Sequence, residues 1–179
     1  MIGLPSSGLH SNGYSLARHA LFKKGGKHLD DLVPGSSRRL ADALLQPTRV
    51  YVNAAEALWA AGVTPRGMAH ISGGGLLNIT RLAANVSYEL DSLPDAPEIF
   101  RFIASAGGVE TATMYETFNM GIGFCVVVSE NDVEAALDAL KGAGEDATRI
   151  GTVTAEPGRT VTIPAAGLKG KGDVFEQIG

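Results

Sequence analysis

The chain has 179 residues, of which 45% are hydrophobic and 19% charged, a composition typical of a globular domain large enough to bury a core. Its formal net charge of −4 gives no long-range attraction for nucleic acid, and no apolar stretch reaches membrane-spanning length, so neither nucleic acid nor a membrane is an expected partner. The first residues lack the basic-then-apolar order of a secretory signal, so a cytoplasmic location is expected.

The first third of the chain predicts a short strand, a glycine- and serine-rich loop and then helices. Residues 1–4 are apolar and resemble a strand cut at its start, so the chain looks like part of something longer. Apolar spacing predicts helices over residues 14–24, 36–45 and 51–61. Ser11 or Asn12 can cap the first of these helices.

The rest of the chain alternates strands with helices. Strands are expected over residues 68–72 and 86–90, and helices over residues 76–84, 97–106, 109–117 and 130–141. The continuous apolar run at residues 121–128 predicts a buried central strand. Strands at residues 148–153 and 160–163 are expected to form a hairpin through the turn at residues 156–158. The predicted fold is α+β in α/β layers, with one mixed β-sheet flanked by helices.

Residues 5–13 combine small residues, hydroxyl groups and a helix start. Gly8 and Gly13 allow the backbone to approach a ligand closely or to take positive φ. The N–H groups that open the following helix carry partial positive charge, which suits a phosphate. The side chains offered to such a ligand are those of Ser6, Ser7, His10, Ser11 and Asn12. A plain strand-to-helix turn is the alternative, and for His10 a structural hydrogen bond is the alternative to catalysis.

Two further glycine-rich stretches can carry chemistry. Gly73, Gly74 and Gly75 are consecutive, which costs conformational entropy and favours close backbone contact with a ligand or a neighbouring segment. A tight strand-to-helix junction is the alternative. Asn119 and Gly121 lead into the predicted central strand, where Asn119 either binds a ligand or shapes the turn.

Other chemistries lack support in the sequence. Neither a phosphate-binding Walker motif nor a dinucleotide fingerprint is present, and the histidines and the single cysteine show no metal-ligand spacing. Seven Lys and Arg against three acids between residues 18 and 49 form either a solvated surface or a positive zone for an anionic ligand. The acids nearest to residues 5–13 are Asp30 and Asp31. Ligands for a nucleotide-bound Mg²⁺ would therefore have to come from elsewhere.

Four sequence motifs follow one another along the chain. They are GLPSSGLHSNGYSLAR at residues 3–18, LLQPTRVYV at 44–52, HISGGGLLNITR at 70–81 and FNMGIGFCVVV at 118–128. Together they resemble the second half of phosphoribosylformylglycinamidine cyclo-ligase, also called AIR synthetase. The resemblance extends to IGTV at residues 150–153, so it covers nearly the whole chain.

The resemblance implies an enzyme of purine biosynthesis. The family closes the imidazole ring of aminoimidazole ribonucleotide from formylglycinamidine ribonucleotide; ATP activates the formyl oxygen as a phosphate, and the amidine-derived nitrogen attacks. The resemblance also implies a homodimer, formed mainly through an amino-terminal domain, with the ligand cleft between two domains. ATP and Mg²⁺ are then cofactors of the full-length enzyme, and this chain alone binds neither firmly.

The resemblance places a carboxy-terminal AIR synthetase-like domain, partly ferredoxin-like, at residues 1–166 and leaves residues 167–179 as a flexible tail. The family's amino-terminal ATP and Mg²⁺ domain is absent, so the isolated chain is expected to be inactive. The matched positions expected to bind substrate or phosphate are Ser6, Ser7, Gly8, His10, Ser11, Asn12, Gly13, Gly73, Gly74, Gly75, Asn119 and Gly121. No catalytic base and no metal ligand is assigned. The alternatives are a stand-alone binding module for a phosphorylated ligand and a sister activity such as a kinase or selenophosphate synthetase.

Overall fold

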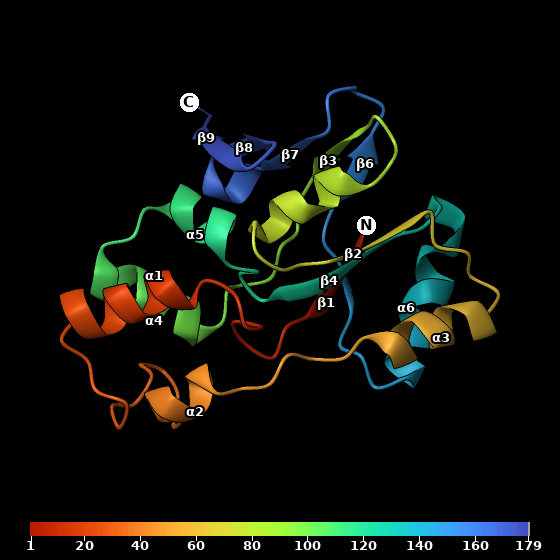
Figure 1. Cartoon of the computed structure of the whole chain (residues 1–179). Coiled ribbons are helices and arrows are strands. Elements are labelled where there is room, and N and C mark those ends of the chain that lie inside the picture. Colours follow the sequence, from red (N-terminus) through yellow and green to blue (C-terminus); the bar gives the residue numbers. More distant parts are fainter. Residues whose placement is uncertain (179) are drawn as a thin grey trace.

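The computed structural model describes residues 1–178 and contains two β-sheets with helices packed around them (Figure 1). The first sheet has four strands in the order β2-β4-β1-β5, all antiparallel to their neighbours. Their bounds are β1 (Ile2–Pro5), β2 (Gly67–His70), β4 (Ile122–Val127) and β5 (Thr148–Arg149). β4 lies between two partners and is largely buried, which confirms the central strand predicted from its apolar run.

The second sheet has five strands in the order β6-β3-β7-β8-β9. Their bounds are β3 (Ser87–Glu89), β6 (Thr152–Thr154), β7 (Thr160–Ile163), β8 (Leu168–Lys171) and β9 (Val174–Gln177). β3 and β7 are parallel, and the other pairs are antiparallel, so this sheet is mixed. An α+β fold with a mixed sheet is therefore confirmed, although the structure has two sheets in place of the expected one.

Helices cover these sheets and fill the space beside them. The helices are α1 (Tyr14–Arg18) continued by the π-helix η1 (His19–Lys24), α2 (Leu40–Leu44), α3 (Val52–Ala60), α4 (Glu98–Gly107), α5 (Thr111–Thr117) and α6 (Val133–Gly142), with the 3₁₀ helices η2 (Gly75–Arg81), η3 (Glu130–Asp132) and η4 (Pro164–Ala166). The helix expected to begin at residue 36 begins only at Leu40, because the preceding residues form an isolated bridge between Leu32 and Arg39. Among residues 1–178, no helix combines the length and the hydropathy that a membrane crossing needs.

Three hydrophobic clusters form the core, and each joins different layers. Ile2, Leu4 and Val126 on one face of the four-stranded sheet pack against α3 and α6. Cys125 and Ile122 are in the cluster that joins the other face to η2 and the five-stranded sheet. The third cluster packs η1, α2, α4 and α5 against one another (Figure 1). The two sheets therefore share one core, and the helical cluster lies beside them.

Two strand predictions near the end of the chain need correction. The strand expected over residues 148–153 divides at Gly151, where the chain leaves the first sheet and enters the second. Gly151 lies so close to the backbone of Glu89 that a side chain would not fit, and its carbonyl accepts a hydrogen bond of 2.8 Å from the amino group of Met1. The predicted hairpin between β6 and β7 is wrong, because β3 lies between them and pairs with both.

The flexible tail predicted for residues 167–179 is also wrong over the part that the structure describes; residue 179 lies outside it. β8 and β9 form a paired hairpin there, and the side chains of Leu168 and Phe175 are buried. Among the glycines that suggested flexibility, Gly170 serves packing, whereas Gly167 and Gly172 take positive φ in turns. A Cβ added at Gly170 would lie 2.5 Å from Cδ2 of Leu77, so a larger residue would push the hairpin off η2.

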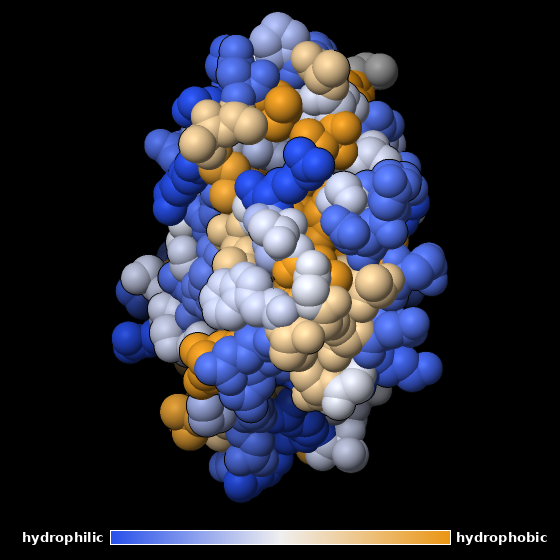
Figure 2. Space-filling view, turned by 90° about the vertical axis from the view of Figure 1, so that its right-hand side faces the viewer, coloured by the Kyte–Doolittle hydropathy of each residue, from blue (hydrophilic) through white to orange (hydrophobic). Residues whose placement is uncertain are grey.

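The surface also carries an apolar groove at one end of the four-stranded sheet, where β2 begins after Arg66 and β4 ends at Val127. Its volume is about 470 Å³, and its other walls come from Leu82, Val86 and Val153. Figure 2 shows hydrophobic side chains among hydrophilic ones in the upper half of one face of the molecule. The glycine-rich loops lie at the opposite end of β2 and β4, so this groove is separate from them.

Candidate functional site

The topology brings the three glycine-rich stretches to one end of the four-stranded sheet. The first stretch follows β1, the second follows β2, and the third precedes β4, which is antiparallel to both strands and lies between them. The carboxyl ends of β1 and β2 therefore meet the amino end of β4. Segments that are more than 100 residues apart along the chain, such as Ser6 and Asn119, become neighbours there.

The first loop is held in an unusual backbone conformation. His10 and Ser11 have φ of 54° and 61°, and Gly13, with φ of 70°, takes the position before the first turn of α1. The cap predicted from Ser11 or Asn12 is wrong, because no side chain caps α1 and the amide of Asn12 donates instead to the carbonyl of His10 at 2.6 Å. The loop is stabilised by its own contacts.

His10 holds this loop from inside. Its side chain is buried, and Nε2 accepts a hydrogen bond of 2.9 Å from the backbone N–H of Ser7 and one of 3.4 Å from that of Arg49. Burial, with smaller contributions from His70 and Arg49, lowers the pKa of His10 to about 4. The ring is therefore neutral near pH 7 and accepts hydrogen bonds, which fits the structural interpretation of this histidine better than a proton-transfer role.

Asn119 connects the third stretch to the first. Its side chain is 1% exposed, and its Oδ1 accepts hydrogen bonds from the hydroxyl of Ser6 at 2.9 Å and from the N–H of Gly121 at 2.8 Å. Its Nδ2 donates to the carbonyl of Gly8 at 2.8 Å. The amide is therefore used within the protein, where it fixes both loops, and Gly121 lies against Pro97 in a conformation with φ of 103°.

A second buried asparagine, Asn78, fixes the second stretch. Its Oδ1 accepts from the N–H of Ser72 at 2.7 Å, and its Nδ2 donates to the carbonyl of Gly73 at 3.0 Å. Gly74 and Gly75 have φ of 100° and 55°. Sequence reasoning missed Asn78, although its place a few residues after three glycines is a usable signal for a side chain that ties down the loop.

The three stretches touch one another. A Cβ added at Gly73 would lie 3.5 Å from Oδ1 of Asn12, so the second loop lies beside the first. Gly13 lies against the ring of Phe118, and Gly75 lies against the backbone carbonyls of Tyr115 and Phe118. The end of α5 is thus enclosed between the first two loops, and the glycines permit this close approach.

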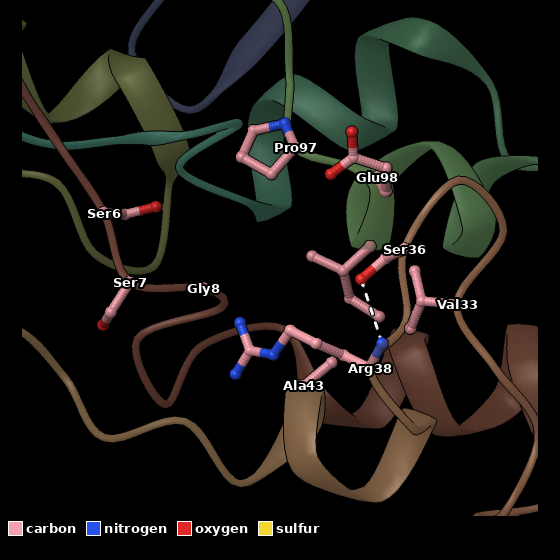
Figure 3. Close-up of a pocket in the computed structure, with 10 residues that line it drawn as sticks. Ser6, Ser7, Gly8, Val33, Ser36, Arg38, Ala43, Pro97 and Glu98 are labelled. Carbon is pink, nitrogen blue, oxygen red and sulfur yellow. Dashed lines mark hydrogen bonds between the residues drawn. The ribbon is translucent and has the colours of Figure 1, made fainter.

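A pocket of about 210 Å³ opens beside the first loop (Figure 3). Its walls are Ser6, Ser7 and Gly8 from the loop, Val33, Ser36, Arg38 and Ala43 from the segment around α2, and Pro97, Glu98 and Ile99 from the start of α4. The guanidinium group of Arg38 points toward Gly8 across this pocket, and one of its nitrogens donates to Oε1 of Gln46 at 2.6 Å. The fork of Arg38 suits a phosphate or carboxylate group, whereas the hydroxyls of Ser6 and Ser7 already donate to Oδ1 of Asn119 and to the carbonyl of Pro47.

The structure divides the predicted site residues into two groups. Ser6, Ser7 and Gly8 line this pocket. The other predicted site residues do not line it and lie where the three glycine-rich loops contact one another. The hydroxyl of Ser11 lies 3.4 Å from that of Thr48. Arg38 was counted in the sequence only as part of a basic zone, because nothing in its neighbourhood showed that it would face the first loop.

The described residues do not form a metal-binding site. Among residues 1–178, no group of three or more His, Cys, Asp or Glu side chains could hold a metal ion. Glu98, the one carboxylate in the pocket wall, forms an ion pair of 3.2 Å with Arg101. The described residues of this chain therefore do not supply the carboxylate ligands that a nucleotide-bound Mg²⁺ needs.

Comparison with known proteins gives relatives over nearly the whole chain. Phosphoribosylformylglycinamidine cyclo-ligase of Methanothermobacter thermautotrophicus is 49% identical over 154 residues, which are 86% of this chain and 44% of the relative. The proteins of the same name from Thermoanaerobacter sp. and Geobacter metallireducens are 43% and 46% identical, over 90% and 86% of this chain and 48% and 44% of theirs. The chain thus spans somewhat less than half the length of these curated relatives.

The fold has a solved counterpart. The crystal structure of tt0281 from Thermus thermophilus aligns with 90% of this chain and 48% of that one, with a TM-score of 0.54 and 19% identity, which speaks for a shared fold. The family model described as "AIR synthase related protein, C-terminal domain" matches residues 1–164. The chain therefore belongs to the AIR synthase related family and corresponds to its C-terminal domain.

Proposed function

We propose that this chain is the carboxy-terminal half of an ATP-dependent cyclo-ligase that converts formylglycinamidine ribonucleotide to aminoimidazole ribonucleotide in purine biosynthesis. The names of its relatives support this assignment, since the three curated relatives cited above are all phosphoribosylformylglycinamidine cyclo-ligases. The observation that carries it within the structure is the convergence of three glycine-rich loops beside a pocket that contains Arg38.

In this proposal the pocket receives the phosphate of the ribonucleotide. The guanidinium of Arg38 pairs with the phosphate oxygens, while Ser6, Ser7 and Gly8 form the opposite wall. The backbone around Gly73–Gly75 and Gly13 borders the rest of the substrate. Asn119, Asn78 and His10 act through the loops, because their side chains are buried and hydrogen-bonded to the backbone.

The nucleotide and its metal belong to a different part of the enzyme in this proposal. The described residues of this chain offer no carboxylate cluster for Mg²⁺, so a partner half must supply the ligands for ATP and Mg²⁺. The isolated chain is then inactive, and the complete enzyme is a cytoplasmic homodimer with its ligand cleft between the two halves. Neither nucleic acid nor a membrane takes part.

A stand-alone binding module for a phosphorylated ligand is the second candidate. The observation that favours it is that Arg38 and the wall opposite it all come from this chain. Calorimetry with formylglycinamidine ribonucleotide, first on the chain alone and then on the chain joined to the amino-terminal half of a relative, separates the two. Equal affinity in both forms, without turnover, favours the module, whereas a gain in affinity on joining favours the cyclo-ligase half.

The proposed function itself is tested by reconstitution. The amino-terminal half of the Methanothermobacter relative is added in trans and formation of aminoimidazole ribonucleotide is followed with and without ATP. Product that requires both halves and ATP supports the assignment. Folded, associated halves that bind the ribonucleotide but form no product would contradict it, and a screen with other phosphate acceptors would then check the sister activities.

A further inference from the structure

The hairpin formed by β8 and β9 lies beyond the family match, which ends at residue 164. It contacts η2, which follows the second glycine-rich stretch, and α5, which precedes the third. We propose that this hairpin is a brace that sets the spacing between η2 and α5 and thereby positions the Gly73–Gly75 loop. Phe175 and Glu116 are its positioning residues. The part of this inference that concerns substrate rests on the proposed function; the part that concerns the loop does not.

One side of the brace is its packing on η2, the short helix that directly follows the Gly73–Gly75 loop. Leu168 and Phe175 are buried in the same cluster as Leu77. Gly170 allows close approach, because a Cβ there would lie 2.5 Å from Leu77 and 2.6 Å from the ring of Phe175. The hairpin and η2 therefore cannot move independently without opening a cavity in this cluster.

The other side of the brace holds α5. The backbone N–H of Phe175 donates to Oε1 of Glu116 at 2.7 Å, a charge-assisted hydrogen bond. The ring of Phe175 meets that of Tyr115 edge-on, with 6.3 Å between the ring centres. Both contacts join β9 to the last turns of α5, and Figure 1 shows β8, β9 and α5 next to one another.

Through these contacts the hairpin packs on both η2 and α5, and α5 in turn packs on the Gly73–Gly75 loop. The carbonyls of Tyr115 and Phe118 lie directly against Gly75, so the position of α5 determines the space that the second glycine stretch occupies. Immediately after α5 comes Asn119, which holds the first loop through Gly8. A displacement of the hairpin would thus reach the Gly73–Gly75 loop through η2 and through α5, and the first loop through α5.

The test compares amide hydrogen exchange in matched variants of the full chain. Phe175→Ala should raise the exchange rates of the hydrogen-bonded amides of Ser72, Gly75 and Leu77 by about tenfold or more, since removal of a buried ring lowers the cost of local opening. Val174→Ala, on the exposed side of the same strand, should leave these rates unchanged. Leu140→Ala, a buried truncation in α6, controls for a general loss of stability.

If Phe175→Ala prevents folding, Glu116 gives the same test with a smaller change. Glu116→Ala should raise exchange at the three amides, and Glu116→Gln, which keeps an acceptor oxygen, should restore most of the protection. Equal exchange at these amides in Phe175→Ala and Leu140→Ala, or no change in Glu116→Ala, would overturn the brace. In the reconstituted enzyme the brace predicts a higher KM for the ribonucleotide in Glu116→Ala with little change in kcat. If the variants show the expected exchange but the reconstituted wild-type enzyme shows no turnover, the brace stands and the proposed function is refuted.

Discussion

Truncation of Asn119 gives the sharpest test of how the loops are held together. In Asn119→Ala, the carbonyl of Gly8 and the N–H of Gly121 lose their partner in a place where both residues are buried. A buried polar group left without a partner costs about 1–3 kcal/mol, so the two together predict a loss of about 2–6 kcal/mol in the free energy of unfolding. The hydroxyl of Ser6 is only partly buried and can turn to water, so it adds little.

Urea unfolding followed by circular dichroism measures this loss. Asn119→Asp keeps the acceptor for Gly121 but places a buried carboxylate oxygen against the carbonyl of Gly8, so near pH 7 it should be at least as destabilised as Asn119→Ala. Asn85→Ala is the matched control, because Asn85 accepts one exposed hydrogen bond of 3.1 Å from Gly158 and should cost less than about 1 kcal/mol. A loss in Asn119→Ala that is no larger than in the control would refute the role of Asn119 in holding the two loops and leave the loop geometry to packing alone.

Three further outcomes are expected from the site. The pKa of His10 is about 4 in the folded state and about 6.5 in the unfolded chain, so the unfolded chain gains the proton first as the pH falls. The free energy of unfolding should therefore drop by about 3 kcal/mol between about pH 6.5 and about pH 4. His10→Gln should show a smaller drop in urea midpoints measured across that range. Arg38→Ala should weaken ribonucleotide binding about tenfold in calorimetry without moving the urea midpoint, whereas the neighbouring Arg39→Ala, whose ion pairs lie outside the pocket, should bind normally. Gly8 and Gly13 both have positive φ, 154° and 70°, so Ala is strained at either position. Gly13→Ala should destabilise the fold more, because its Cβ would overlap the Phe118 ring, whereas a Cβ at Gly8 would be in ordinary contact with Gln46 at 3.6 Å; equal urea midpoints would contradict this reasoning.

The elements that the sequence predicted well have strong local signals. The helix at α6 follows from apolar residues at helical spacing, and β4 follows from a continuous apolar run. Strand partners carry no such local signal. β3 has three residues, yet it separates β6 from β7, and the division between β5 and β6 depends on a close contact of Gly151 with Glu89. These pairings are decided by tertiary packing.

The same contrast applies to the candidate site. Its glycine-rich loops are visible in the sequence, because their composition is unusual. The long-range contacts are not visible in it. Asn119 was a candidate, but its hydrogen bond to Gly8, 111 positions earlier, was not expected, and Arg38 faces the first loop only because the segment around α2 folds back beside it. Contacts across such separations depend on the fold, so sequence reasoning found the loops and missed the place of Arg38. Asn78 was also missed, although its partners Ser72 and Gly73 are only six and five positions away.

The central claim, that this chain is half of a cyclo-ligase, is tested most directly in a single fused polypeptide. The amino-terminal half of the Methanothermobacter relative is joined to Met1, and formation of aminoimidazole ribonucleotide is measured from formylglycinamidine ribonucleotide and ATP. The account predicts product in step with ATP consumption, and at least about a tenfold rise in KM when Arg38 is replaced by Ala. A folded fusion that binds both substrates and forms no aminoimidazole ribonucleotide, while the parent relative does so under the same conditions, would contradict it.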